Sequence, residues 1–124
     1  MSFEERRRKR SSDPLVALHY QLSRARLDAA VDTLVLADAS GVMVAGAGGW
    51  AACEELAAYA PLLAETAASR EPSRFSSLRS EVELRAVSVD GQDVLLCARA
   101  SRRGPHVGEA LARAAVGIAR ILAA

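Results

Sequence analysis

Residues 33–46, TLVLADASGVMVAG, decide the fold of this chain. Two short β-rich runs, Leu34-Val35-Leu36 and Val42-Met43-Val44, flank a polar turn. In that turn, Asp38 can cap the backbone with its carboxylate, and Gly41 adopts a positive φ at little cost. The stretch therefore predicts a β-hairpin. Because its other residues are almost all small or aliphatic, we expect the hairpin to lie in the middle of a sheet.

A charged arm and a helix precede this hairpin. Residues 1–12, MSFEERRRKRSS, hold too little apolar surface to offset the entropy of ordering, so we expect a disordered basic arm. Its run Arg6–Arg10 either contacts anionic lipid, nucleic acid or an acidic partner, or stays in solvent. Asp13 as N-cap and Pro14 at the first helical position then predict a helix over residues 14–30. Its expected apolar stripe is Leu15, Leu18, Leu22, Ala25 and Ala29.

Residues 50–68 predict a second, alanine-rich helix with two apolar stripes. One stripe runs through Leu56 and Leu63, and the other through Trp50 and Cys53. A single sheet face is expected to bury only one of them, so the other is predicted to be a protein interface. Pro61 lies inside the helical pattern and should kink the helix.

The second half of the chain predicts strands and a closing helix. Residues 74–78 carry a weak signal for a short strand. In residues 82–89 apolar and polar residues alternate, and the apolar positions change from even to odd numbers after Leu84, which indicates a bulge or twist. Asp90-Gly91 is a strong hairpin signal. The strand that follows is apolar on both faces at Val94–Cys97, so we expect it in the middle of the sheet. A last helix is predicted from residue 106 to the C-terminus.

These elements predict one α+β domain over residues 13–124. Because hairpins make the sheet antiparallel and helices flank both hairpins, we expect a three-layer α/β/α sandwich. The two terminal helices, 14–30 and 106–122, should lie together on one face of the sheet.

Composition limits the classes of function. The chain has 124 residues, 51% of them apolar and 25% charged, with a net charge of +1, which is typical of one globular domain without strong overall attraction to nucleic acid or membrane. No run of about 18 apolar residues is present and no leader is evident, so we expect a soluble, cytoplasmic protein. Arginine supplies nearly all of the basic residues and alanine is abundant, which indicates a GC-rich bacterial genome. Cys53 and Cys97 are expected to be reduced and to behave as small apolar residues.

No arrangement of residues predicts catalysis. His19 and His106 lie at the starts of different helices, and no nucleophile elbow or phosphate-binding loop occurs. Ligands at metal-binding spacing are also absent. We therefore expect a protein that is not an enzyme and that has no catalytic residue, cofactor or metal site.

The order of elements resembles the Roadblock/LC7 family. The resemblance rests on LVLADASGVMVAGAG, EELAAYAPLLAETAA and ELRAVSVDGQDVLLCARA, and it covers residues 13–124. It implies a five-stranded antiparallel sheet with the middle helix on one face and both terminal helices on the other. It also implies a non-enzymatic dimer, formed through the middle helix and the edge strand after it, that partners a small Ras-like GTPase as activator or scaffold, including in polarity systems. The dimer would be a homodimer or a pair with a paralogous Roadblock protein.

Two alternatives remain at this point. A GAF/PAS-like or profilin-like sensory domain has similar layers but needs an apolar cavity with polar anchors for a small ligand. Nucleic-acid binding through Arg6–Arg10 lacks aromatic residues between the basic ones. For the interaction module, we predict that the dimer or partner surface comprises Trp50, Leu56, Tyr59, Leu63, Phe75 and Leu78.

Overall fold

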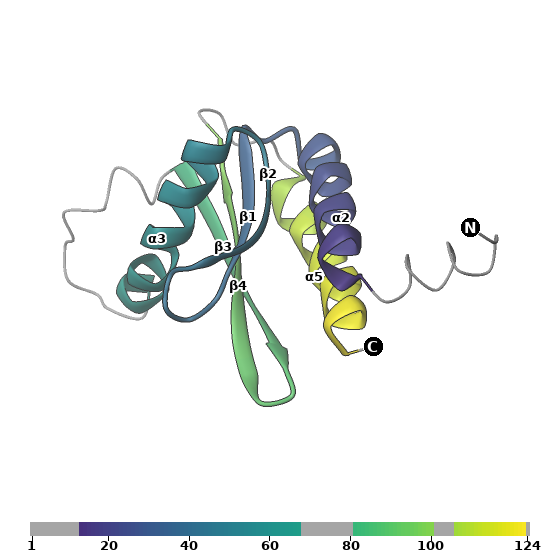
Figure 1. Cartoon of the computed structure of the whole chain (residues 1–124). Coiled ribbons are helices and arrows are strands. Elements are labelled where there is room, and N and C mark those ends of the chain that lie inside the picture. The colour runs from purple at the N-terminus through teal and green to yellow at the C-terminus, as the bar shows by residue number, and fades with distance from the viewer. Residues whose placement is uncertain (1–12, 68–80, 101–105, 124) are drawn as a thin grey trace.

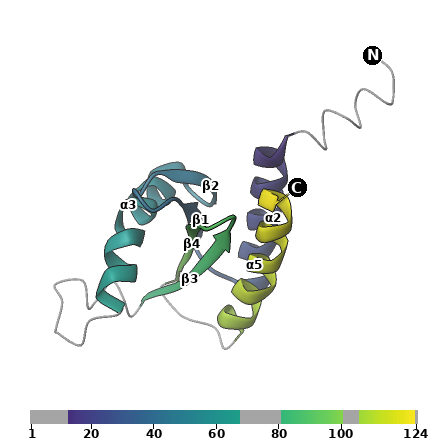
Figure 2. The same cartoon turned by 90° about the horizontal axis from the view of Figure 1, so that it is seen from below.

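The computed structural model describes residues 13–67, 81–100 and 106–123. A four-stranded antiparallel sheet separates one helix from a layer of two helices (Figures 1 and 2). This is the predicted α/β/α sandwich, and the two terminal helices share one face as expected. The elements in chain order are α2 (Pro14–Ala29), β1 (Thr33–Ala37), β2 (Met43–Ala47), α3 (Trp50–Ala67), β3 (Val82–Val89), β4 (Gln92–Arg99) and α5 (Val107–Ala123).

The sheet has the strand order β2-β1-β4-β3. Strand β4 is interior, as its two-sided apolar sequence predicts, and pairs with β1 and with β3. Of the first hairpin only β1 is interior, because β2 lies at an edge. The strand expected at residues 74–78, which would be the fifth strand of the sheet, lies outside the described residues. Both pairs that β4 makes are antiparallel. Successive side chains of β4 therefore point to opposite faces of the sheet.

The two hairpin turns form as their sequences predict. Asp38 Oδ1 accepts hydrogen bonds from the backbone N–H groups of Ser40 at 2.8 Å and Val42 at 3.0 Å, and Gly41 has a φ of +84°. In the second turn Asp90 and Gly91 have φ values of +52° and +78°, the signs that a two-residue type I′ turn requires. Local chemistry therefore fixes the register of both hairpins.

Each face of the sheet packs against its own helix layer. Residues such as Val35 and Cys97 point toward α3, whereas Leu34 and Leu96 point toward α2 and α5. All four are fully buried, which is why β1 and β4 read as continuous apolar runs. The α2–α5 side holds the larger cluster, which includes Leu18, Leu22, Leu111 and Ile118.

Strand β3 explains the change of parity noted in the sequence. Its pairing with β4 is continuous from Val82 to Val89, so the expected bulge at Leu84 is absent. Val82 and Leu84 pack on the α3 side, whereas Val87 and Val89 pack on the α2–α5 side. The apolar residues change face because different helices cover the two ends of the strand. The irregularity lies instead in the β1–β2 pairing, between Leu36 and Ala37.

Helix α2 is tied down at both ends and along its side. Asp13 Oδ1 accepts from the Val16 N–H at 3.3 Å, which confirms the N-cap, and the αL residue Ala30 ends the helix. His19 Nδ1 donates to the carbonyl oxygen of Gly46 at 3.1 Å and so links α2 to edge strand β2. The buried face follows the predicted stripe except at Leu15, which is exposed.

Helix α3 buries residues of both predicted stripes and leaves Trp50 exposed at its start, which corrects the expectation that one whole stripe would be left over. Cys53, Leu56, Ala57, Ala60 and Leu63 are all buried and form one broad face against the sheet. The two stripes are neighbours around the helix, and their alanines leave room for both.

Pro61 lies on the flank of α3, and the helix continues through it. Because proline has no N–H, the Ala57 carbonyl has no helical partner. A Cβ on Gly41 would lie 3.4 Å from this carbonyl oxygen and 3.3 Å from that of Ala58. Glycine therefore lets the β1–β2 turn pack directly against the middle of α3.

Candidate protein interface

The outward side of α3 carries a ridge of exposed residues that lies away from the sheet. Ala51, Glu55, Ala58 and Leu62 recur at helical spacing and are exposed, with Leu62 43% exposed. They lie opposite the buried face that contains Cys53 and Ala60. We call these four residues the α3 ridge. Small alanines beside a leucine allow a second helix or strand to approach the backbone closely.

The six predicted interface residues do not form one surface. Leu56 and Leu63 are only 2% and 3% exposed and belong to the core between α3 and the sheet. Because both are buried within the single chain, they hold α3 in place rather than present a surface. Phe75 and Leu78 lie outside the described residues.

Trp50 and Tyr59 are the two predicted residues near the surface. Trp50 is 68% exposed, whereas Tyr59 is half-buried and packs beside the core. Trp50 and Tyr59 are nine positions apart, which corresponds to two and a half helical turns, so their side chains lie on opposite flanks of α3. The α3 ridge runs between these flanks, and a partner that covered it would reach both aromatic rings.

Sequence reasoning missed the α3 ridge because neither of the two stripes that it assigned to the helix includes Ala51, Ala58 or Leu62. The signal was present in the spacing of Ala51, Ala58 and Leu62, which fall on the same side of the helix. Leu62 is exposed and the next residue, Leu63, is buried. A shift of one position along the helix therefore moves a side chain from the outward side to the core.

Strand β3 lies next to α3 in the candidate interface and at an edge of the sheet among the described residues. The strand is held at its start, where Arg99 Nε lies 3.1 Å from Glu81 Oε2 and the Ala100 N–H donates to the Glu81 carbonyl at 3.0 Å. Both charged side chains are partly exposed, so we assign this ion pair a modest effect on stability. Its role is to fix where β3 begins relative to β4.

Charge distinguishes α3 from the rest of the molecule. The helix carries Glu54, Glu55 and Glu65 and no lysine or arginine. All three carboxylates are on the exposed part of the helix. The α3 side is therefore acidic, with Glu55 on the α3 ridge itself and Glu54 and Glu65 beside it.

Both cysteines lie on the α3 side of the sheet and are inert. Cys97 is fully buried on β4, and burial raises the pKa of its thiol to about 12. Burial also raises the pKa of Cys53, whose Sγ donates to the Ala47 carbonyl at 3.6 Å. Thiols that stay protonated at neutral pH are poor nucleophiles and poor metal ligands, which fits a packing role.

Among the residues that the structure describes, no three His, Cys, Asp or Glu side chains gather closely enough to hold a metal ion. Within the same ranges, no helix has the length and apolar character that crossing a bilayer requires.

These features define an α/β/α sandwich domain whose single-helix layer carries the exposed α3 ridge. No family model matches the chain, and no curated protein matches it. Among solved structures the chain is similar to MglB of Myxococcus xanthus, with a TM-score of 0.58 and 16% sequence identity. The likeness covers 87% of this chain and 89% of MglB. At this identity the likeness shows a shared fold over nearly the whole of both chains, and it supports the Roadblock/LC7 fold for this domain.

Proposed function

We propose that this chain is a non-enzymatic dimeric interaction module of the Roadblock/LC7 type that regulates or scaffolds a small Ras-like GTPase or a related polarity or signalling complex. The observation that carries the proposal is the fold shared with MglB, a Roadblock/LC7-like protein, together with the exposure of the α3 ridge on the outward side of that helix. The sequence resemblance to the family points to the same helix and to the edge strand after it.

The proposed dimer pairs the α3 ridges of two copies around a two-fold axis. Ala51, Ala58 and Leu62 supply the apolar contact, and Trp50 and Tyr59 close it from the flanks. The glutamates of the two α3 helices then face one another across the border of the contact. Because like charges weaken the dimer and salt screens them, dimerisation should strengthen as ionic strength rises.

The sensory alternative finds less support. A pocket of about 270 Å³ lies between α2 and α5, and its lining includes Gln21, Arg24, Asp28 and Arg113. A small-molecule sensor pocket is enclosed and mainly apolar, whereas this one is an open, charged groove. Nothing about the groove favours a buried organic ligand.

Light scattering of the purified full chain after size-exclusion chromatography tests the dimer. The wild type should have about twice the 13.1 kDa mass of one chain. Leu62→Glu should be folded and monomeric, because Leu62 is exposed and a carboxylate there would be buried in the contact. Val116→Glu is the matched control, since Val116 is an exposed apolar residue of α5 on the other side of the sheet, and it should remain dimeric.

A monomeric wild type, or a Leu62→Glu variant as dimeric as the control, would contradict the proposed interface.

The proposed interaction with a GTPase is tested separately. Hydrolysis of GTP by a Ras-like GTPase from the same genome, and its binding in the GDP and GTP states, should be measured with and without the chain. Absence of both binding and any change in rate would remove this part of the proposal and leave the dimer standing.

A further inference from the structure

The outer side of α2 carries large apolar side chains that the core does not use. Tyr20 and Leu27 are 79% and 73% exposed, and Val16 is also exposed. The spacing of these three residues places them on one side of the helix, opposite the buried Leu18, Leu22, Ala25 and Ala29. The helix is thus apolar on two opposite sides. One side packs on the sheet, and the other faces away from the molecule.

Helix α5 lies beside α2 and extends this outward surface. The exposed Val116 is on the side of α5 opposite its buried face, as Tyr20 is on α2. Figure 2 shows the two helices forming one layer that is separated from α3 by the sheet. Apolar side chains therefore project from both helices of one outer layer. We call Val16, Tyr20, Leu27 and Val116 the outer patch.

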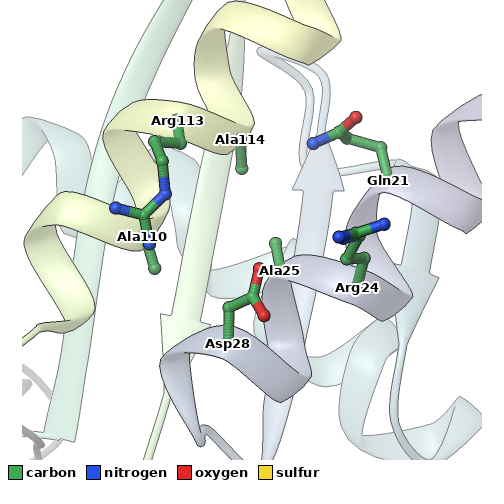
Figure 3. Close-up of a pocket in the computed structure, with 7 residues that line it drawn as sticks. All are labelled: Gln21, Arg24, Ala25, Asp28, Ala110, Arg113 and Ala114. Atoms are coloured by element: carbon green, nitrogen blue, oxygen red, sulfur yellow. The ribbon is translucent and has the colours of Figure 1, made fainter.

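Basic side chains border the outer patch. Arg24 from α2 and Arg113 from α5 line the groove between the helices together with Asp28 (Figure 3). None of these three takes part in an ion pair within the described residues. Two guanidinium groups are thus held beside exposed apolar residues without a carboxylate bound to either.

Net charge is distributed unevenly in the same sense. Residues 1–29 contain seven basic and four acidic side chains, and α5 adds two basic and one acidic. The arm, α2 and α5 together therefore carry +4, although the whole chain carries +1. The remainder, which includes α3, is net acidic. Helices α2 and α5 by themselves carry four arginines against Asp28 and Glu109, a charge of +2, so their layer of the sandwich is basic even without residues 1–12.

We propose that the α2–α5 layer binds peripherally to an anionic phospholipid bilayer, with the outer patch inserted at the level of the headgroups and Arg24 and Arg113 on the lipid phosphates. A surface that joins exposed aliphatic and aromatic residues to arginines matches this environment, because the apolar groups enter the interface while guanidinium groups stay with the phosphates. Tyrosine suits the boundary, since its ring is apolar and its hydroxyl is polar. The run Arg6–Arg10, directly before α2 in the sequence, adds to the attraction for an anionic surface.

The bilayer is the occupant that the charges favour. A second copy that covered this layer with its own α2–α5 layer would set two basic surfaces against each other, which like-charge repulsion disfavours, whereas an anionic bilayer complements the charge. Binding a bilayer through α2 and α5 instead leaves α3 free for a partner on the other side of the sheet. The inference does not rest on the proposed dimer, because the two surfaces are separated by the sheet.

Flotation of the full chain with lipid vesicles tests the inference. The protein should float with vesicles made of equal parts phosphatidylcholine and phosphatidylserine, and it should stay in solution with phosphatidylcholine alone. Added salt should weaken the binding, because it screens the attraction. Failure of the wild type to bind the anionic vesicles would overturn the proposal.

Two sets of variants separate the outer patch from general charge. Tyr20→Ser with Leu27→Ser should lower the partition coefficient at least about tenfold, and Arg24→Gln with Arg113→Gln about fivefold per arginine, the factor expected for one basic residue at an anionic surface. The residues are on the surface, so both variants should melt within about two degrees of the wild type. The control Val42→Ser should bind normally, since Val42 lies in the β1–β2 turn next to α3.

Unchanged binding in both double variants would overturn the proposal and assign any vesicle binding to Arg6–Arg10. Light scattering of the same variants completes the test. If either double variant changed the mass of the wild-type particle, the outer patch would be a contact between proteins, and the bilayer proposal would fail.

Discussion

Helix α3 covers one face of the sheet alone, whereas α2 and α5 share the other. The α3 side buries the smaller cluster and ends in an acidic surface with a narrow ridge of alanine and leucine. The α2–α5 side buries the larger cluster and ends in a basic surface with tyrosine, leucine and valine. The sheet thus separates two outward surfaces of opposite charge. The two proposed contacts therefore use opposite sides of the sheet, and neither would block the other.

Burial divides α3 itself into a core side and a contact side, and charging each side should have very different effects. Leu63→Glu places a carboxylate in the core and removes a buried leucine, which should cost more than about 4 kcal/mol and unfold most of the protein. Leu62→Glu, one residue earlier, changes an exposed side chain. Its monomer should therefore stay folded, with a cooperative thermal transition within a few degrees of that of the wild type. Circular dichroism melts of both variants check this, and a folded Leu63→Glu variant would show that the core side is misassigned.

Alkaline pH should act on the α3 side through its thiols. Because the pKa of Cys97 is about 12 in the folded chain and 9.0 in the unfolded one, the unfolded state loses its proton first. The contribution of this thiol to the free energy of unfolding is fully present below pH 9. It falls as the pH rises toward 12, by up to about 1.4 kcal/mol per pH unit and about 4 kcal/mol in all. Cys53 contributes in the same direction.

Urea unfolding between pH 8 and pH 12 measures this slope. Cys97→Ala should be less stable at neutral pH because it leaves a cavity, yet its stability should fall less steeply above pH 9 than that of the wild type. Comparing slopes removes the contributions of the tyrosines, lysine and arginines, which both proteins share. Equal slopes would mean that the Cys97 thiol is not buried as described.

On the α2 side, a hydrogen bond from His19 to the Gly46 carbonyl links α2 to strand β2 of the sheet. His19→Ala should lower the free energy of unfolding by about 1 kcal/mol, and the melting temperature by about four degrees, because the carbonyl loses its partner. His106→Ala is the matched control at an exposed position and should change stability by less than about 0.5 kcal/mol. A His19→Ala variant as stable as the control would remove this link from the description.

Most of the architecture could be predicted from local signals in the sequence. Asp13-Pro14 set the start of α2, Asp38 and Gly41 the first turn, and Asp90-Gly91 the second, because each of these needs only neighbouring backbone groups. The two-sided apolar run of β4 likewise predicts an interior strand. These features do not depend on which helix covers which face.

The surfaces were harder to predict because they depend on the angular width of each buried face. Leu56 and Leu63 were predicted at the interface because α3 was expected to bury only one narrow stripe. The alanines of α3 instead allow it to bury a wide face that includes both leucines. Tyr20 and Leu27 escaped notice because the core stripe of α2 was read without the opposite side. Deciding both cases requires the position of the sheet relative to each helix, which no single segment specifies.

The central claim is that two copies meet through α3 and leave the α2–α5 layers outward. Distances between spin labels test this directly, because Cys53 and Cys97 are buried with raised thiol pKa values and should not react with the label. One label is attached at Glu54→Cys, beside the α3 ridge, and in a second protein at Leu27→Cys, in the outer patch. The account predicts a shorter distance between copies for Glu54→Cys than for Leu27→Cys. The reverse order, or no dipolar coupling at either position, would contradict it.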